Sequence, residues 1–255
     1  AKGGNLVLSS GQSMATSSGE VSISTVDSGF YGVSGAVSVV TGAAQAGQSG
    51  DISIHTGISQ LGSGGDIGLI VGDGYTGNGG DVAIKAGATF GNNTVGNVTT
   101  GGGINVEAGL SEYGNGGSAA FSAGAGQKQG GSISLTAGGA EELFGGDIVV
   151  STGKSSATSS GSLYVVTADS GADGTSGEVQ VRTGDTTYGP SGALTFGSGQ
   201  ASDGAGGDIT LAVGTGDAGK GGNMVMLGGE TKAENMTGGV VSIQAGTGNN
   251  ANGAG

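Results

Sequence analysis

A glycine-led unit of about fifteen residues recurs along nearly the whole chain. Most units open with Gly and a polar residue, continue with alternating aliphatic and variable residues, and end on small residues, as in "SGDISIHTG" at 49–57. Successive leading glycines are 14 to 17 residues apart, apart from one interval of 22. The sixteen leading glycines are Gly4, Gly19, Gly35, Gly50, Gly65, Gly80, Gly102, Gly117, Gly131, Gly146, Gly161, Gly177, Gly192, Gly207, Gly222 and Gly239. Self-similarity at a fixed period indicates a repeat architecture in which each unit stacks on its neighbours.

The aliphatic residues in each unit alternate with a period of two, which is the period of a β-strand with two different sides. Ile67, Leu69 and Val71 share one side of their unit, which we call the inward phase. Between the alternating runs lie segments rich in Gly, Ser, Asn and Asp, such as 72–80, whose composition favours turns. No 3.6-residue pattern predicts a helix. The sequence therefore predicts an all-β fold, a single continuous parallel β-solenoid over 1–255 built from sixteen strand–turn units.

Two windings of this solenoid fit the repeat. Two units could form one rung, with odd and even strands in two facing sheets, or each unit could form one complete coil. The turn segments are mostly polar, as in "GTGDAGKGG" at 214–222, and offer an aliphatic face little to pack against. We therefore favour two units per rung, because one inward face then meets another.

A longer repeat lies above the short one. "SSGQSMATSSGEVSI" at 9–23 matches "STGKSSATSSGSLYV" at 151–165, and the leading glycines Gly4 and Gly146 are 142 residues apart. Nine units form one super-repeat, so the chain holds a little under two, at about 4–145 and 146–255. Neither end resembles a polar cap, and an uncapped solenoid is expected to continue into a longer chain or to stack end to end.

Composition and charge exclude several classes of function. The chain has 255 residues, 64 of them Gly, with no Cys, and its 20 Asp and Glu against 7 Lys and Arg give a net charge of -13. A surface this acidic repels phosphate backbones, so nucleic acid is not an expected partner. No run of 18 apolar residues is present, so no membrane-spanning helix is expected.

Catalysis has little support in the sequence. His55 is the single histidine and occupies an outward position of its unit, where a solvated surface residue is expected. The cations are scattered, and the turns are too short to build a substrate cleft. We therefore expect no enzymatic activity.

Calcium is the one cofactor that the pattern suggests. "GNGGDVAI" at 77–84 partly resembles the calcium-binding nonapeptide of RTX solenoids, and Asp51, Asp66 and Asp81 hold the same position in successive units. Stacked carboxylates repel one another unless a cation bridges them, which makes these three residues candidate Ca²⁺ ligands. The favoured alternative is that each Asp bonds its local backbone. Ice binding is disfavoured, because the regularly spaced Thr residues lie on the inward phase.

Three glycosylation sequons give the strongest chemical signal. Asn92 (N-N-T), Asn97 (N-V-T) and Asn235 (N-M-T) fall in the only two lengthened turns, which are equivalent positions of the super-repeat. A bulky glycan needs an exposed loop, and a lengthened turn supplies one. We predict N-linked glycans at Asn92 or Asn97 and at Asn235, and hence an extracellular or cell-surface location.

Taken together, these repeats resemble the Gly/Ser/Asp-rich parallel β-solenoids of large secreted or cell-surface proteins, including adhesins and extracellular filaments. The resemblance implies a structural subunit or segment of a secreted, glycosylated filament or appendage, which assembles by stacking solenoid rungs on copies of itself. The competing hypothesis is a binding module, either an adhesin stalk or a cation- or ice-binding solenoid.

Overall fold

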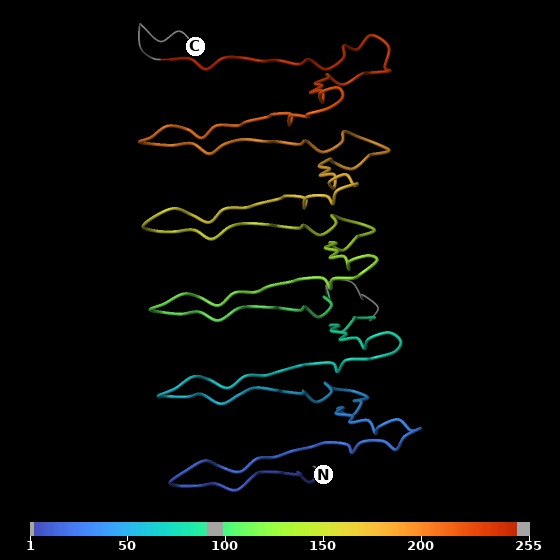
Figure 1. The fold of residues 1–255 in the computed structure, drawn as a ribbon, viewed down its shortest axis with the longest axis vertical. Coiled ribbons are helices and arrows are strands. Elements are labelled where there is room, and N and C mark those ends of the chain that lie inside the picture. The colour runs from blue at the N-terminus through green and yellow to red at the C-terminus, as the bar shows by residue number, and fades with distance from the viewer. Residues whose placement is uncertain (1–2, 91–98, 249–255) are drawn as a thin grey trace. The chain divides into compact units, whose positions relative to one another are not determined.

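The structure is a computed structural model that describes residues 3–90 and 99–248. The chain divides into two parts, an N-terminal half, Ala1–Ile133, and a C-terminal half, Ser134–Gly255. Over the described residues the backbone forms neither an α-helix nor a β-strand, so both halves consist of irregular segments joined by bends. Within each half, an extended segment leads to a bend, and the next extended segment leads back from it (Figure 1).

The bends recur with the period of the glycines. They fall at 14–16, 30–31, 45–47, 60–62, 75–77, 112–114, 127–128, 141–143, 156–158, 172–173, 187–189, 202–204, 217–219 and 233–235. The bends at 14–16 and 30–31 have counterparts 142 residues later, at 156–158 and 172–173. Seven of these bends end on Gly, as at Gly77 and Gly219, where the backbone has a positive φ.

Equivalent bends use the same side-chain hydrogen bonds. The amide of Thr16 donates to Ser13 Oγ at 3.0 Å, and the amide of Thr158 donates to Ser155 Oγ at 2.9 Å. The hydroxyl groups of each Ser–Thr pair also lie within hydrogen-bond distance of each other. A Ser hydroxyl that binds a nearby backbone amide stabilises a turn locally, so these bends form without help from distant residues.

The predicted β-solenoid is wrong, because the extended segments are not paired by a backbone ladder. Among the residues that the structure describes, nine backbone–backbone hydrogen bonds form, and every one joins the N–H of one glycine to the carbonyl of another. A folded domain has about one internal hydrogen bond per residue, most of them between backbone groups. Alternation of apolar and polar residues favours an extended backbone, but a strand also needs a partner segment along its length.

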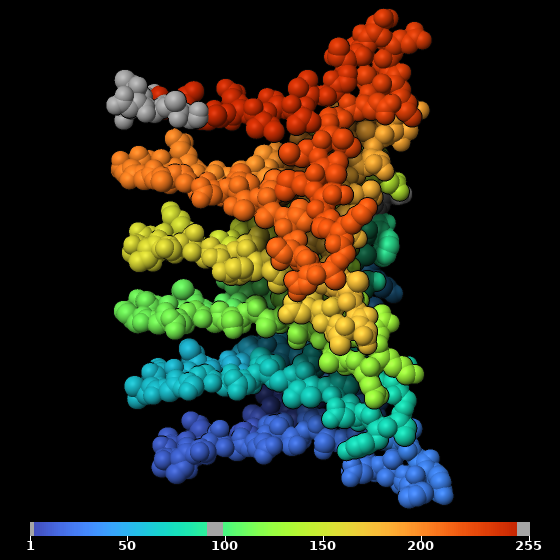
Figure 2. Space-filling model, turned by 45° about the horizontal axis from the view of Figure 1, so that its top comes forward, coloured from blue at the N-terminus to red at the C-terminus, as the bar shows by residue number. Residues whose placement is uncertain are grey.

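The inward phase does not form a core, which overturns both predicted windings. No described residue is buried, and the apolar side chains of 3–90 and 99–248 meet solvent. The accessible surface is 26019 Å². A compact monomer of this mass exposes about 9,800 Å² and its unfolded chain about 34,000 Å². In the space-filling view the out-and-back segments are narrow arms with side chains open to solvent (Figure 2). Neither two facing sheets nor one coil per unit is present.

The glycine–glycine bonds close the turns instead. Gly19 N–H donates to Gly11 O at 3.0 Å, and their super-repeat equivalents Gly161 and Gly153 form the same bond at 3.0 Å. In seven of the nine bonds a leading glycine donates to a glycine that ends the preceding run. One such bond at the base of a turn holds its two ends together without extending into a sheet.

Candidate functional site

The lengthened turn between Gly229 and Gly239 is the clearest candidate site. Its base is closed by a hydrogen bond from Gly239 N–H to Gly229 O at 2.8 Å. Inside the turn, Ala233 N–H donates to Thr231 Oγ1 at 3.2 Å and a bend follows at 233–235. These local bonds hold the ends of the turn together while its tip stays in solvent.

Asn235 lies at the end of that bend with a left-handed backbone. Its φ is 60°, and it is the one non-glycine residue with a positive φ among those described. Asn tolerates this conformation better than most residues, which explains its place here. Asn235 and Thr237 are both exposed, and the side chain of Met236 between them is 70% exposed. The turn therefore presents a complete sequon to solvent.

Asn92 and Asn97 lie outside the described residues, but the base of their turn is described. Gly102 N–H donates to Gly87 O at 2.9 Å, and the Thr89 hydroxyl donates to Thr100 O at 3.1 Å. Gly87 precedes Gly229 by 142 residues, so the two lengthened turns are closed by equivalent glycines.

The candidate calcium ligands are exposed and lie in different units of the repeat. Asp51, Asp66 and Asp81 each follow a leading glycine and sit in irregular, solvent-exposed segments. Within 3–90 and 99–248, no group of three or more His, Asp or Glu side chains is placed to hold a metal ion. The three residues remain separate carboxylates in the structure.

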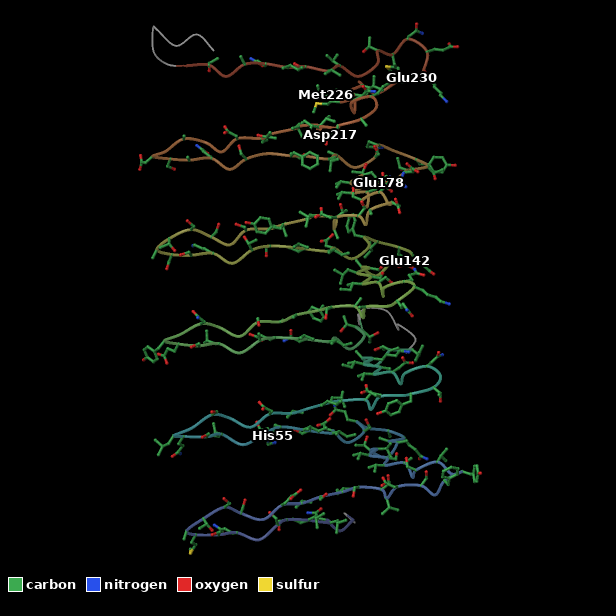
Figure 3. All side chains as sticks on the ribbon, in the orientation of Figure 1. His55, Glu142, Glu178, Asp217, Met226 and Glu230 are labelled. Carbon is green, nitrogen blue, oxygen red and sulfur yellow. The ribbon has the colours of Figure 1, made fainter. Side chains whose placement is uncertain are left out.

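His55 is also an exposed, isolated side chain. It lies partway along an extended segment, with none of the other labelled residues beside it (Figure 3). The described part of the chain contains no pocket. That part also contains no helix of the length and apolar character that a membrane crossing requires.

The first inward-phase side chain of a run is about half exposed, whereas outward neighbours such as Ile70 and Val149 are more than 80% exposed. Ile67 is 59% exposed and Ile70, three residues later in the same run, is 90% exposed. In the C-terminal half, Ile148 is 57% exposed and the adjacent Val149 is 82% exposed, which is the same contrast. The first inward residue of a run is therefore partly shielded, and the rest of its surface faces solvent.

A close contact between some leading glycines and the last inward residue of the preceding run is a feature that sequence reasoning did not find. A Cβ on Gly80 would lie 2.7 Å from Val71 Cγ1, and a Cβ on the equivalent Gly222 would lie 2.7 Å from Val213 Cγ1. In other units a Thr occupies the place of Val, as in Gly35 against Thr25. The leading glycine is thus needed for close approach. The signal in the sequence is its fixed distance from the last inward residue.

Replacing Gly80 with Ala is expected to open the 72–80 turn. The new Cβ would force Val71 from its rotamer, at a cost of about 0.5–1.5 kcal/mol. Gly79→Ala is the matched control, because a Cβ there meets nothing within 4 Å. Amide chemical shifts of 71–81 should move in Gly80→Ala, return toward wild type in Val71→Ala/Gly80→Ala, and stay unchanged in Gly79→Ala. Equal shifts in both single variants would contradict the contact.

Comparison with known proteins adds no relative to this description. No family model matches the chain, and neither a curated protein nor a solved structure matches it.

Proposed function

We propose that the protein is a structural subunit or segment of a secreted, glycosylated extracellular filament or surface appendage, without a catalytic role, which works by associating with copies of itself. The main observation in support of this proposal is that the repeated apolar side chains are exposed to solvent. A chain that devotes every unit to alternating aliphatic residues, yet buries none of the described ones, has its packing partners outside itself.

The surface area supports an assembly of substantial size. The chain exposes 26019 Å², which exceeds the surface of a compact monomer of the same mass by about 16,000 Å². A stable protein–protein interface buries about 1,600 Å² in total, and apolar burial stabilises by about 25 cal/mol per Å². Association that covers a tenth of the excess therefore reaches the size of a specific interface.

The lengthened turns support the extracellular part of the proposal. A glycan at Asn235 would project from an exposed turn whose base is closed by the Gly239–Gly229 bond, so the ends of the turn need not change when the glycan is added. The net charge of -13 keeps such a chain soluble before it assembles.

Electron microscopy of the protein from its native source tests the proposal. We expect filaments or extended appendages that carry the protein, identified with an antibody against the 229–239 turn after enzymatic glycan removal. Mass spectrometry of the same material should find glycopeptides that contain Asn235. Dispersed single chains without glycan in native material would overturn the proposal.

A further inference from the structure

We infer that a second copy of this chain binds along the partly exposed inward phase, and that the carboxylates beside seven of the apolar runs make this association depend on charge screening. The inference rests on the proposed function and identifies the surface, the partner and the control of assembly. We call the surface the inward row and define it as the first two apolar inward-phase residues of each unit.

The side chains of the inward row have nearly the same exposure from one repeat unit to the next, in both halves of the chain. Its first positions are about half exposed and its second positions about three-quarters exposed. The first positions include Val21 at 50%, Val37 at 58%, Ile52 at 53%, Ile67 at 59%, Val82 at 52%, Ile148 at 57%, Leu163 at 59%, Val179 at 54%, Leu194 at 51% and Ile209 at 57%. Such regular exposure is the property of a surface that repeats with the sequence, not of scattered apolar residues.

A copy of the same chain is the partner that matches this row. The partner must offer apolar side chains at the fifteen-residue interval of the repeat, and a second copy does so in every unit. It must also offer free backbone groups, because the described segments pair few of their own N–H and C=O groups. A compact globular partner has neither property, since its surface hydrophobics are scattered and its backbone groups are already paired.

The position after each leading glycine carries the charge that opposes association. It is acidic in seven units and basic in none; the acidic residues are Glu20, Asp51, Asp66, Asp81, Asp147, Glu178 and Asp208. Two cations, Lys85 and Arg182, lie in the same runs. Copies aligned in register would place carboxylate beside carboxylate, and like charges directly opposite each other destabilise a pair of extended segments.

Salt is the direct control of this repulsion. Raising NaCl from about 0.1 M to about 1 M shortens the Debye length from about 10 Å to about 3 Å, so exposed carboxylates on neighbouring copies no longer oppose contact. The inference predicts that the full chain is dispersed at low salt and associates as salt rises.

Sedimentation velocity of the full, unglycosylated chain across this NaCl range tests the surface. The test variant is Ile67→Thr/Ile148→Thr/Leu163→Thr, which alters three residues of the inward row. The matched control is Ile70→Thr/Val149→Thr/Val166→Thr, which alters outward residues of the same three runs, 90%, 82% and 81% exposed. We expect the inward triple to need at least tenfold more protein to associate, and the outward triple to behave as wild type.

A second series tests the charge. Asp51→Asn/Asp66→Asn/Asp81→Asn should associate at lower salt than wild type, because three like charges are removed and the apolar row is kept. CaCl₂ at matched ionic strength should act no better than NaCl. A strong preference for Ca²⁺ that the Asn triple loses would replace screening with cation bridging and overturn this part of the inference.

The outcomes separate this inference from the proposed function. Equal loss of association in the inward and outward triples, or no loss in the inward triple, would overturn the inward row as the contact surface even where native filaments are present. A wild-type chain that stays dispersed at every salt concentration would overturn self-recognition. Absence of filaments in native material would overturn the proposed function itself.

Discussion

Glycan at the 229–239 turn is expected to disappear completely when Asn235 is replaced by Gly. The substitution removes the acceptor amide but keeps the left-handed backbone, since glycine adopts a φ of 60° without strain. Loss of glycan in this variant therefore reports the missing side chain, not a refolded turn. The measurement is intact mass and glycopeptide mass spectrometry of protein secreted from a eukaryotic host.

Two further variants control this result. Thr237→Ser keeps the sequon and should retain the glycan, whereas Thr237→Ala destroys the sequon and should lose it with Asn235 still present. Because Asn92 and Asn97 stand in the other lengthened turn, their glycopeptides serve as internal standards. An unmodified Asn235 in the wild-type secreted protein would contradict the prediction.

Amide hydrogen exchange of the dispersed chain at low salt is expected to be fast along nearly all described segments. Their amides lack backbone partners and lie in solvent, and such groups open at almost no free-energy cost. The slower amides should be the bonded glycines, such as Gly117, Gly146 and Gly239. After association at high salt, amides in the apolar runs should slow by roughly tenfold or more, because pairing between copies protects them.

The comparison within one sample supplies the control for this experiment. Amides at the bends 75–77 and 217–219 lie away from the inward row and should stay fast in both states. Strong protection of the apolar runs in the dispersed chain would show a backbone ladder within one molecule and contradict the described fold.

Turn positions were predictable from the sequence because their causes are local. The Ser–Thr bonds at 13–16 and 155–158 involve residues three apart, and Asn235 takes a backbone conformation suited to its own side chain. The Asn235 sequon is exposed because it lies in a lengthened turn, and the length of this turn can be read from the sequence. Local chemistry of this kind does not depend on where the rest of the chain lies.

Pairing and burial were not predictable, and the solenoid prediction failed on them. The alternation in runs such as 66–71 fits a strand with a buried side, but burial needs a second surface at the right distance. With few large side chains per unit and many glycines, the entropy of ordering the backbone is high and the apolar area gained is small. The close approach of Gly80 to Val71 was also not predicted, although their spacing is fixed by the repeat, because the contact forms across a turn between two consecutive repeat units.

The sequence by itself determined the period, the super-repeat, the positions of the bends and the place of the sequons, because each depends on the order of residues over one unit. Only the tertiary structure decided that the extended segments remain unpaired and that the inward phase stays half-exposed. Whether an alternating run becomes a strand depends on backbone pairing between distant segments, and within the described chain the backbone–backbone hydrogen bonds are single glycine–glycine bonds at the bases of turns.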